Sequence, residues 1–185
     1  MREEGWGMSR MKTLYIDRST GESRDGNWAE DLDLEGVERI VVGTGPGSFA
    51  GIRSALAFAQ GYALGTGCEV LGLPSACAFA VPGERIAVLG DARQGKIWIA
   101  LFTGFDLEKD VFQVDRSEVA AAVPAACKVT TPDAKRIDAF LRETFGARYL
   151  GGRVPTGEGL RRFAEANPAI LRPEPLPIYL NPAVR

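Results

Sequence analysis

Histidine is absent from all 185 residues of this sequence. Histidine is the most common general base, zinc ligand and catalytic-triad member, so its absence excludes many hydrolases and zinc enzymes. A nucleophilic serine or cysteine would need a lysine or a carboxylate as its base. Metal chemistry would depend on oxygen ligands and a hard cation such as magnesium. We therefore expect no catalytic residue and no metal site.

Cysteine is scarce, and long apolar runs are missing. Cys68, Cys77 and Cys127 are odd in number and lack CxxC spacing, which favours reduced thiols in the core over a disulfide or zinc site. No run of about 18 apolar residues suggests a membrane span, and residues 1–10 lack the layout of a signal peptide. These features predict a cytoplasmic protein with no membrane partner.

A large excess of either charge is missing too. The 22 basic and 24 acidic residues give a formal net charge of -2. This balance provides no electrostatic reason to expect unaided binding to nucleic acid or to a membrane surface. If RNA is involved, we expect another subunit to hold it.

The first half of the chain carries apolar runs separated by turn residues. They predict strands over 13–16, 37–42, 68–73 and 85–92, and helices over 49–64 and 75–80. Residues 37–92 then form a βαβαβ unit of a mostly parallel α/β layer. Residues 1–10 are expected to be a disordered leader, which leaves open a start at Met1, Met8 or Met11, and 21–36 to be a polar loop.

The pattern changes after Asp91. Hairpin strands are expected over 96–104 and 111–114, followed by helices at 117–123, 133–146 and 157–167, a strand at 147–152 and an extended tail at 172–182. The sequence therefore predicts two small α/β lobes, an N-terminal lobe over 11–91 and a C-terminal lobe over 92–185.

The segment "GTGPGSFAGIRS" (43–54) joins the strand at 37–42 to the helix at 49–64. A phosphate-binding Walker loop is excluded because no lysine follows, and a dinucleotide fingerprint would lack its third glycine. Two interpretations remain. The amides of Gly47, Ser48 and Phe49 at a helix start could bind an anion, or the glycines could simply let helix and strand pack closely.

The helix at 49–64 shows small or apolar residues on several faces and no obvious solvent face. A helix on the outside of an α/β sheet should show one polar face, so we expect this helix to contact another subunit. The residues expected at this interface are Phe49, Ile52, Ala55, Leu56, Phe58, Ala59, Tyr62 and Ala63.

Several motifs together resemble one family. "GTGPGSFAGIRSALAFAQGYALG" (43–65) closely resembles the TsaB (YeaZ) signature GxGPGSFTGLRxGxAxAKGLA. "LYIDRST", "LGLPSACAFA", "DARQGKIWIALF" and "PIYL" resemble, in order, its first strand, its V-x-x-SSLEALA segment, its DAR-x-GEVY hairpin and its closing P-x-YLR. The match covers most of the chain from Met11 onward.

This resemblance implies an ASKHA fold, the actin-like ATPase and ribonuclease H-like architecture of two related lobes. It also implies a role in the N6-threonylcarbamoyladenosine (t6A) modification of tRNA adenosine 37. In that family TsaB is a non-catalytic partner that dimerises with the metal-bearing TsaD subunit through its N-terminal lobe. TsaE and the synthase TsaC complete the pathway. The implied partners are a TsaD-type subunit and a TsaE-type ATPase, with a homodimer in isolation and tRNA contacted only indirectly.

The sequence also departs from the family pattern. Family members have a β-hairpin and a long helix between the first strand and the strand before the glycine loop, whereas this chain has only the polar segment from Asp17 to Val37. We therefore expect a truncated N-terminal lobe. Ala50, Gln60 and Asn181 replace the family's threonine, lysine and final arginine.

Two alternatives stay open. In one, the chain is an ATP-binding phosphotransferase of the same superfamily, with Asp17, the turn from Gly45 through Gly47 to Ser48, and Asp91 around a magnesium nucleotide. In the other it is a degenerate homodimeric relative that has lost TsaD binding. No cofactor is expected otherwise, apart from weak ATP or ADP with magnesium at a complex interface. We expect Asp17 and Asp91 instead to end strands and accept hydrogen bonds from turns.

Overall fold

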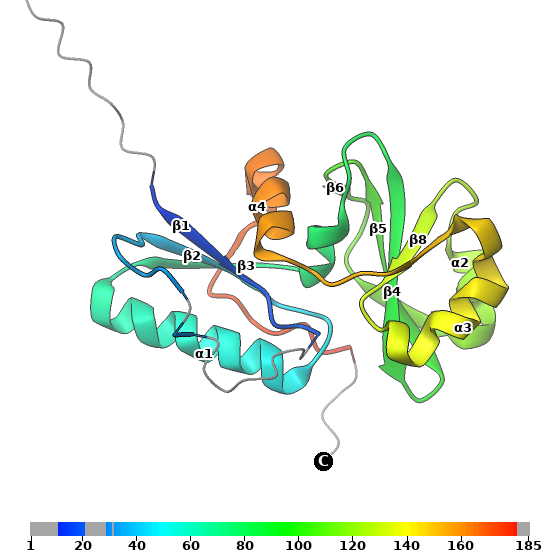
Figure 1. Ribbon diagram of the computed structural model, residues 1–185, viewed down its shortest axis with the longest axis horizontal. Helices are drawn as coiled ribbons and strands as arrows, with labels where there is room; N and C mark the ends of the chain where they lie inside the picture. Colours follow the sequence, from blue (N-terminus) through cyan, green and yellow to red (C-terminus); the bar gives the residue numbers. More distant parts are fainter. Residues whose placement is uncertain (1–10, 21–28, 31, 181–185) are drawn as a thin grey trace, which may run out of the picture.

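The computed structural model describes residues 11–20, 29–30 and 32–180. These residues form two sheets that lie beside each other, each covered by helices (Figure 1). The first sheet has the order β1-β2-β3-β10, and the second has the order β6-β5-β4-β8-β9 with β7 paired to β5. We call the first sheet with its helices the first lobe, and the second sheet with its helices the second lobe.

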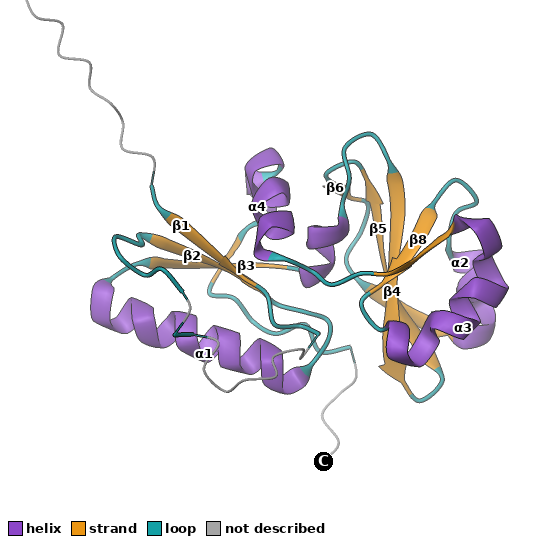
Figure 2. Ribbon diagram, in the orientation of Figure 1, coloured by secondary structure: helices purple, strands orange, loops and turns teal. Residues whose placement is uncertain are grey.

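The strands and helices have the following bounds, and Figure 2 colours them by type. The strands are β1 (Thr13–Ile16), β2 (Arg39–Gly43), β3 (Glu69–Leu73), β4 (Arg85–Arg93), β5 (Lys96–Thr103), β6 (Asp106–Leu107), β7 (Phe112–Asp115), β8 (Lys128–Thr131), β9 (Tyr149–Gly152) and β10 (Arg172–Pro173). The helices are α1 (Phe49–Thr66), η1 (Ser75–Phe79), η2 (Arg116–Glu118), α2 (Val119–Ala122), α3 (Ala134–Phe145), η3 (Gly146–Arg148), α4 (Gly157–Ala166) and η4 (Pro168–Ile170).

The first sheet is buried on both faces. β1, β2 and β3 are parallel, and the apolar run of β2 at 40–42 has no solvent exposure. Ile40 and Val42 pack beneath α1, whereas Val41 belongs to a cluster that includes Leu160 and Phe163 of α4. A strand covered on both sides needs an unbroken apolar run, and β2 has one.

Helix α1 begins at Phe49, as predicted, and ends at Thr66, two residues beyond the predicted end. The Ser48 hydroxyl caps the start by accepting a hydrogen bond from the Gly51 amide at 3.3 Å, and Gly67 ends the helix with a left-handed φ of 74°. One side faces the sheet, and the opposite side is exposed. The expectation that α1 has no solvent face is therefore wrong.

This result corrects the expected interface. Ile52, Ala55, Leu56 and Ala59 are 0–5% exposed and pack inside the first lobe, so they cannot form a contact surface with another subunit. Phe49 is exposed, and Phe58, Tyr62 and Ala63 are half-buried. The exposed side escaped detection because it consists mostly of small residues. It comprises Ala50, Arg53, Ser54, Ala57, Gln60, Gly61, Leu64 and Gly65.

The second sheet is built on the β4–β5 hairpin. The two strands pair antiparallel from Arg85–Thr103 to Arg93–Lys96, and the turn places Arg93, Gln94 and Gly95 at positive φ. Alternate residues of β4 face opposite sides of the sheet. Ala87 and Leu89 pack against α3, whereas Ile86 and Val88 join the cluster around Phe163.

Strand β4 was predicted to complete a βαβαβ unit with the strands at 37–42 and 68–73, and this is wrong. The structure places β4 in the second sheet, so the boundary predicted after Asp91 falls inside this strand. Long pairing with β5, its neighbour in sequence, and parallel pairing with β8 hold β4 there.

The C-terminal half of the chain also returns to the first lobe. Helix α4 packs against β1 and η1, and β10 pairs antiparallel with β3. The extended tail predicted at 172–182 is confirmed over its described part, where the Ile178 amide donates to the Thr44 carbonyl at 2.8 Å. The ring of Phe163 meets Phe102 and Phe105 of the second lobe edge to face, at centroid distances of 5.8 and 5.9 Å. The two lobes therefore share one apolar cluster, and each lobe has a further cluster of its own.

Some expectations fall partly outside the described residues. The leader at 1–10 lies outside them, as does most of the loop predicted over 21–36, whose described part consists of turns and bends. Within the described residues β1 pairs directly with β2, as expected for a truncated lobe. Over the same residues, no helix has the length and apolarity that crossing a membrane requires.

The burial of Ala59 gives a direct test of how α1 is oriented. We expect Ala59→Glu to lower the free energy of unfolding by several kcal/mol, because it places an unpaired charge in an apolar core. Ala57→Glu on the exposed side is the matched control and should change stability by about 0.5 kcal/mol at most. Urea unfolding followed by circular dichroism measures both. Equal stability of the two variants would contradict this orientation.

Candidate functional site

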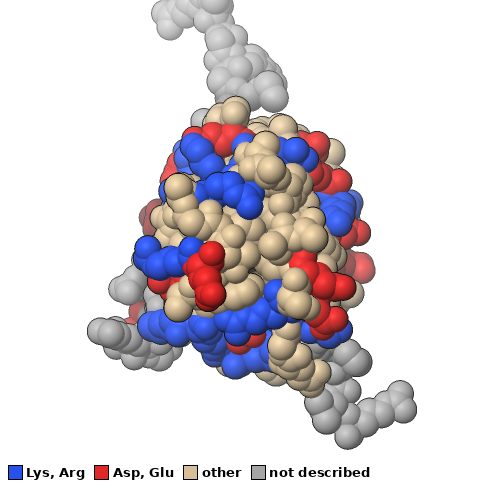
Figure 3. All heavy atoms as spheres, turned by 90° about the vertical axis from the view of Figure 1, so that its right-hand side faces the viewer, with Lys and Arg blue, Asp and Glu red and all other residues tan. Residues whose placement is uncertain are grey.

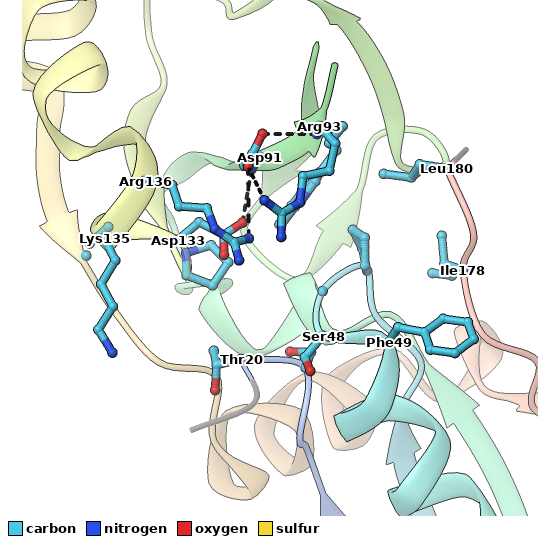
Figure 4. Close-up of a pocket in the computed structure, with 18 of the residues that line it drawn as sticks. Thr20, Ser48, Phe49, Asp91, Arg93, Asp133, Lys135, Arg136, Ile178 and Leu180 are labelled. Carbon is cyan, nitrogen blue, oxygen red and sulfur yellow. Dashed lines mark hydrogen bonds and ion pairs between the residues drawn. The ribbon is translucent and has the colours of Figure 1, made fainter. Parts of the chain in front are cut away.

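A cleft of about 1130 Å³ lies between the lobes (Figure 4). The first lobe contributes the residues after β1 and the glycine loop before α1. The second lobe contributes the tip of the β4–β5 hairpin, the start of α3 and the residues after β9. The lining comprises Ser19, Thr20, Pro46, Gly47, Ser48, Phe49, Asp91, Ala92, Arg93, Trp98, Pro132, Asp133, Ala134, Lys135, Arg136, Gly152, Arg153, Val154, Ile178, Tyr179 and Leu180.

The glycine loop is tied down by backbone hydrogen bonds. The Thr44 amide donates to Leu73 at 2.9 Å, and the Gly45 amide donates to the Ser75 hydroxyl at 2.9 Å. The peptide bond from Gly45 to Pro46 is cis. The Ser48 amide donates to the Ser19 carbonyl at 2.5 Å. The Ser48 amide is therefore already used and is not free to bind an anion, whereas anion binding by the Gly47 and Phe49 amides stays a prediction.

Close packing explains two of the glycines. A Cβ atom at Gly47 would overlap the Ser19 carbonyl, and one at Gly51 would overlap the Arg18 carbonyl. The residues after β1 therefore lie directly against the first turn of α1. These contacts support the second interpretation, in which the loop is a tight packing turn.

Asp17 lies beneath this loop and outside the cleft lining. Its Oδ1 accepts hydrogen bonds from the Ser19 amide at 2.8 Å and the Ser19 hydroxyl at 2.7 Å, so the expected turn bonds are confirmed. Its Oδ2 is buried and has no hydrogen-bond partner among the described residues. A Cβ atom at Gly43 would overlap this oxygen, so only glycine leaves room for the carboxylate. Burial raises the pKa of Asp17, and the nearby Ser19 and Ser75 hydroxyls partly offset this rise.

Two carboxylates lie on the second-lobe side of the cleft. Asp91 accepts a hydrogen bond from the Arg93 amide at 3.0 Å, which confirms the predicted turn bond, although β4 continues past it to Arg93. Asp133 accepts a hydrogen bond from the Asp91 amide at 2.9 Å. Burial raises the pKa of Asp133, while the hydrogen bond from the Asp91 amide and the charge of Arg136 oppose the rise. The side chains of Arg93 and Arg136 approach Asp91 at 3.6 and 3.9 Å.

The structure brings together some of the residues proposed for anion or nucleotide binding. Gly47, Ser48 and Asp91 line the cleft, whereas Asp17 and Gly45 do not. A magnesium nucleotide does not fit these residues. Asp17 is buried below the loop, Asp91 is engaged with its turn and two arginines, and the described residues contain no cluster of three potential metal ligands.

Sequence reasoning missed most of the second-lobe wall. The side chain of Arg93 is 62% exposed. Asp133, Lys135, Arg136 and Arg153 were not identified. These residues follow β8 and β9, and the carboxyl ends of neighbouring parallel strands meet at one sheet edge. This signal was missed because β8 itself was not predicted.

Comparison with known proteins identifies the family. A model described as "TsaD: tRNA N6-adenosine threonylcarbamoyltransferase" matches residues 29–152, so the chain belongs to this family. No curated protein matches the chain.

Solved structures show the fold. YeaZ from Pseudomonas aeruginosa is 22% identical with a TM-score of 0.61, over 82% of this chain and 78% of that one. An uncharacterized protein similar to peptidase YEAZ, from the same organism, is also 22% identical with a TM-score of 0.59, over 83% of this chain and 78% of that one. The resemblance to the TsaB (YeaZ) family is confirmed, and the architecture is the two-lobed ASKHA fold.

Asp17 gives a pH-dependent test of the loop. Its native pKa lies above the value of about 3.9 in an unfolded chain, so the native state retains a proton that the unfolded state has released. The free energy of unfolding should therefore fall as pH rises from about 4 through the native pKa.

We expect Asp17→Asn to remove this dependence and to raise stability at pH 7 by about 1–3 kcal/mol, because a neutral amide replaces a buried carboxyl whose Oδ2 has no hydrogen-bond partner among the described residues. Urea unfolding across this pH range measures the effect. The exposed Asp110→Asn is the control, with an expected change of about 0.5 kcal/mol or less. A less stable Asp17→Asn protein, or an unchanged pH profile, would disprove our account of this carboxyl.

Proposed function

We propose that this chain is a non-catalytic, TsaB-like cytoplasmic subunit that supports t6A modification of tRNA adenosine 37 by binding a TsaD-type catalytic subunit. The family match carries the pathway assignment. The exposed side of α1 carries the assignment of a binding role.

The exposed side of α1 has the composition of a contact surface. Ala50, Ala57 and Gly61 present little side chain, and Leu64 is 91% exposed. Small residues allow another backbone to approach closely, and a large exposed apolar residue supplies area that burial would stabilise. Arg53 is the one residue on this side that carries a full charge, among its described members.

Among the described residues, the segment before β2 covers one flank of α1. The Tyr62 hydroxyl donates to the Leu34 carbonyl at 2.8 Å, and Leu32 packs against the cluster beneath the helix. These contacts leave Ala57, Gln60 and Gly61 exposed.

The sequence also supports a role without catalysis. The catalytic relative depends on an HxxxH metal pair, and this chain contains no histidine. The alternative as a magnesium-dependent phosphotransferase is not favoured, because Asp17 and Asp91 do not face each other across the cleft. A TsaE-type ATPase is proposed to join through the TsaD-type subunit, and cofactor binding is proposed to be absent in the isolated chain.

The partner is testable by capture from the organism's own extract. We expect the tagged chain to retain TsaD-type and TsaE-type homologues, identified by mass spectrometry. Ala57→Glu should weaken this capture at least tenfold, because an unpaired charge would be buried at the contact. Ala121→Glu, on the exposed part of α2, is the matched control and should capture normally.

Light scattering on the purified chain distinguishes the homodimer alternative from binding to a TsaD-type subunit. A homodimer that Ala57→Glu converts to a folded monomer, without capture of a TsaD-type protein, would favour a degenerate relative. Capture that is unchanged in Ala57→Glu would remove this side of α1 from consideration.

A further inference from the structure

We propose that the cleft between the lobes binds a segment of single-stranded RNA, with the basic second-lobe wall contacting phosphates and the Phe49–Tyr179 pair stacking on bases. The choice of RNA over DNA rests on the proposed function. The site itself rests on the charges and rings described below.

The second-lobe wall carries a local excess of positive charge. Of the described residues that line the cleft, four are cationic (Arg93, Lys135, Arg136 and Arg153) and two are acidic (Asp91 and Asp133). Figure 4 shows Arg93, Lys135 and Arg136 on one side of the cavity, across from Ser48 and Phe49. A band of Lys and Arg also lies low on the outer face of the second lobe (Figure 3). The net charge of -2 hides this asymmetry.

The arginines of the wall keep donors available for a ligand. Arg93 and Arg136 approach the same carboxylate at 3.6 and 3.9 Å, beyond the usual 2.7–3.2 Å of an N–H···O hydrogen bond. One Asp91 cannot neutralise both guanidinium groups. Their side chains are 62% and 48% exposed, so a phosphate can reach them without displacing buried structure.

An aromatic pair stands on the opposite side of the cleft. The rings of Phe49 and Tyr179 are 57% and 56% exposed, and their centroids lie 5.6 Å apart at an interplanar angle of 35°. The guanidinium of Arg53 lies 4.9 Å from the Phe49 centroid. Exposed rings beside cations are the usual platform on which proteins stack the bases of single strands.

The tail holds Tyr179 in place. Its neighbours on either side are fixed, because the Ile178 amide donates to Thr44 at 2.8 Å and the Leu180 carbonyl accepts from the Gln113 side chain at 3.0 Å. Thr44 belongs to the first lobe, and Gln113 to the second. The backbone that carries the ring is therefore held on both sides before a ligand arrives, which lowers the entropic cost of binding.

A strand fits the cleft better than a single nucleotide. The volume of about 1130 Å³ exceeds the roughly 300–1,000 Å³ usual for small-ligand sites. The cations come from the hairpin tip, the start of α3 and the residues after β9, so they are distributed along a wall. Such spacing suits consecutive phosphates, and the aromatic pair suits the bases between them.

Fluorescence anisotropy with a labelled oligouridylate and the full chain tests the proposal. We expect binding that weakens with salt between about 50 and 200 mM, with a log–log slope of about -2 to -3 for three or four phosphate contacts. Arg136→Ala combined with Arg153→Ala should reduce the magnitude of that slope by about 1.4. Phe49→Ala and Tyr179→Ala should each weaken binding roughly 5- to 150-fold.

Arg161→Ala is the matched control for lost charge. Arg161 lies on α4 outside the cleft and pairs with Glu158 and Glu165, so its removal should leave binding unchanged. Equal weakening by this control would overturn the site, as would the absence of binding at low salt. If the chain binds ADP or inorganic phosphate but does not bind oligouridylate, the cleft is a site for a small anion. If it binds duplex RNA as tightly as oligouridylate, recognition of a single strand is ruled out.

The two proposals can fail separately. Ala57 lies outside the cleft lining, so Ala57→Glu should prevent partner capture and leave RNA binding intact. RNA binding without any captured TsaD-type subunit would reject the proposed function alone. If Phe49→Ala abolishes partner capture and leaves RNA binding unchanged, the aromatic pair belongs to a protein contact and the RNA site is rejected.

Discussion

The close approach of the residues after β1 to the first turn of α1 is the constraint on which the rest of the arrangement depends. The carbonyls of Arg18 and Ser19 occupy the space that side chains at Gly51 and Gly47 would fill. This contact uses the Ser48 amide, buries Asp17 beneath the loop and directs Phe49 toward the cleft. One of the three amides considered for anion binding, that of Ser48, is therefore already engaged within the fold.

Local patterns predicted the elements well, and they failed where partners distant in the sequence decide the outcome. The apolar run at 40–42 and the caps at Ser48 and Gly67 fixed β2 and α1, because strand burial and helix ends depend on neighbouring residues. Strand β4 was assigned to the wrong sheet because its apolar run fits either one, and only pairing with β5 and β8 decides. The exposed side of α1 was missed because alanine and glycine occur both in cores and on exposed surfaces, so their positions do not distinguish the two.

The candidate site shows the same division. The sequence pointed to three residues of the cleft because each lies next to a recognisable apolar strand pattern: Gly47 and Ser48 follow one, and Asp91 lies near the end of another. The cations from Arg93 to Arg153 meet only after the second sheet has formed, so neither their spacing nor the overall charge revealed them. The net charge determines the electrostatic potential far from a protein. A ligand within a Debye length of the surface instead interacts mainly with the nearby charged side chains of the cleft.

The return of the chain to its first lobe has a consequence for synthesis on the ribosome. Strands β1 to β3 are complete by Leu73, yet the helix that covers one face and the strand that pairs with the edge of β3 come from Gly157–Ala166 and Arg172–Pro173. Until those residues emerge from the exit tunnel, the nascent first lobe exposes the apolar face around Val41 and Leu71 together with an open strand edge. Such surfaces bind chaperones and pair with other chains, so the first lobe is the part of the nascent protein most in need of protection, although its strands are made first.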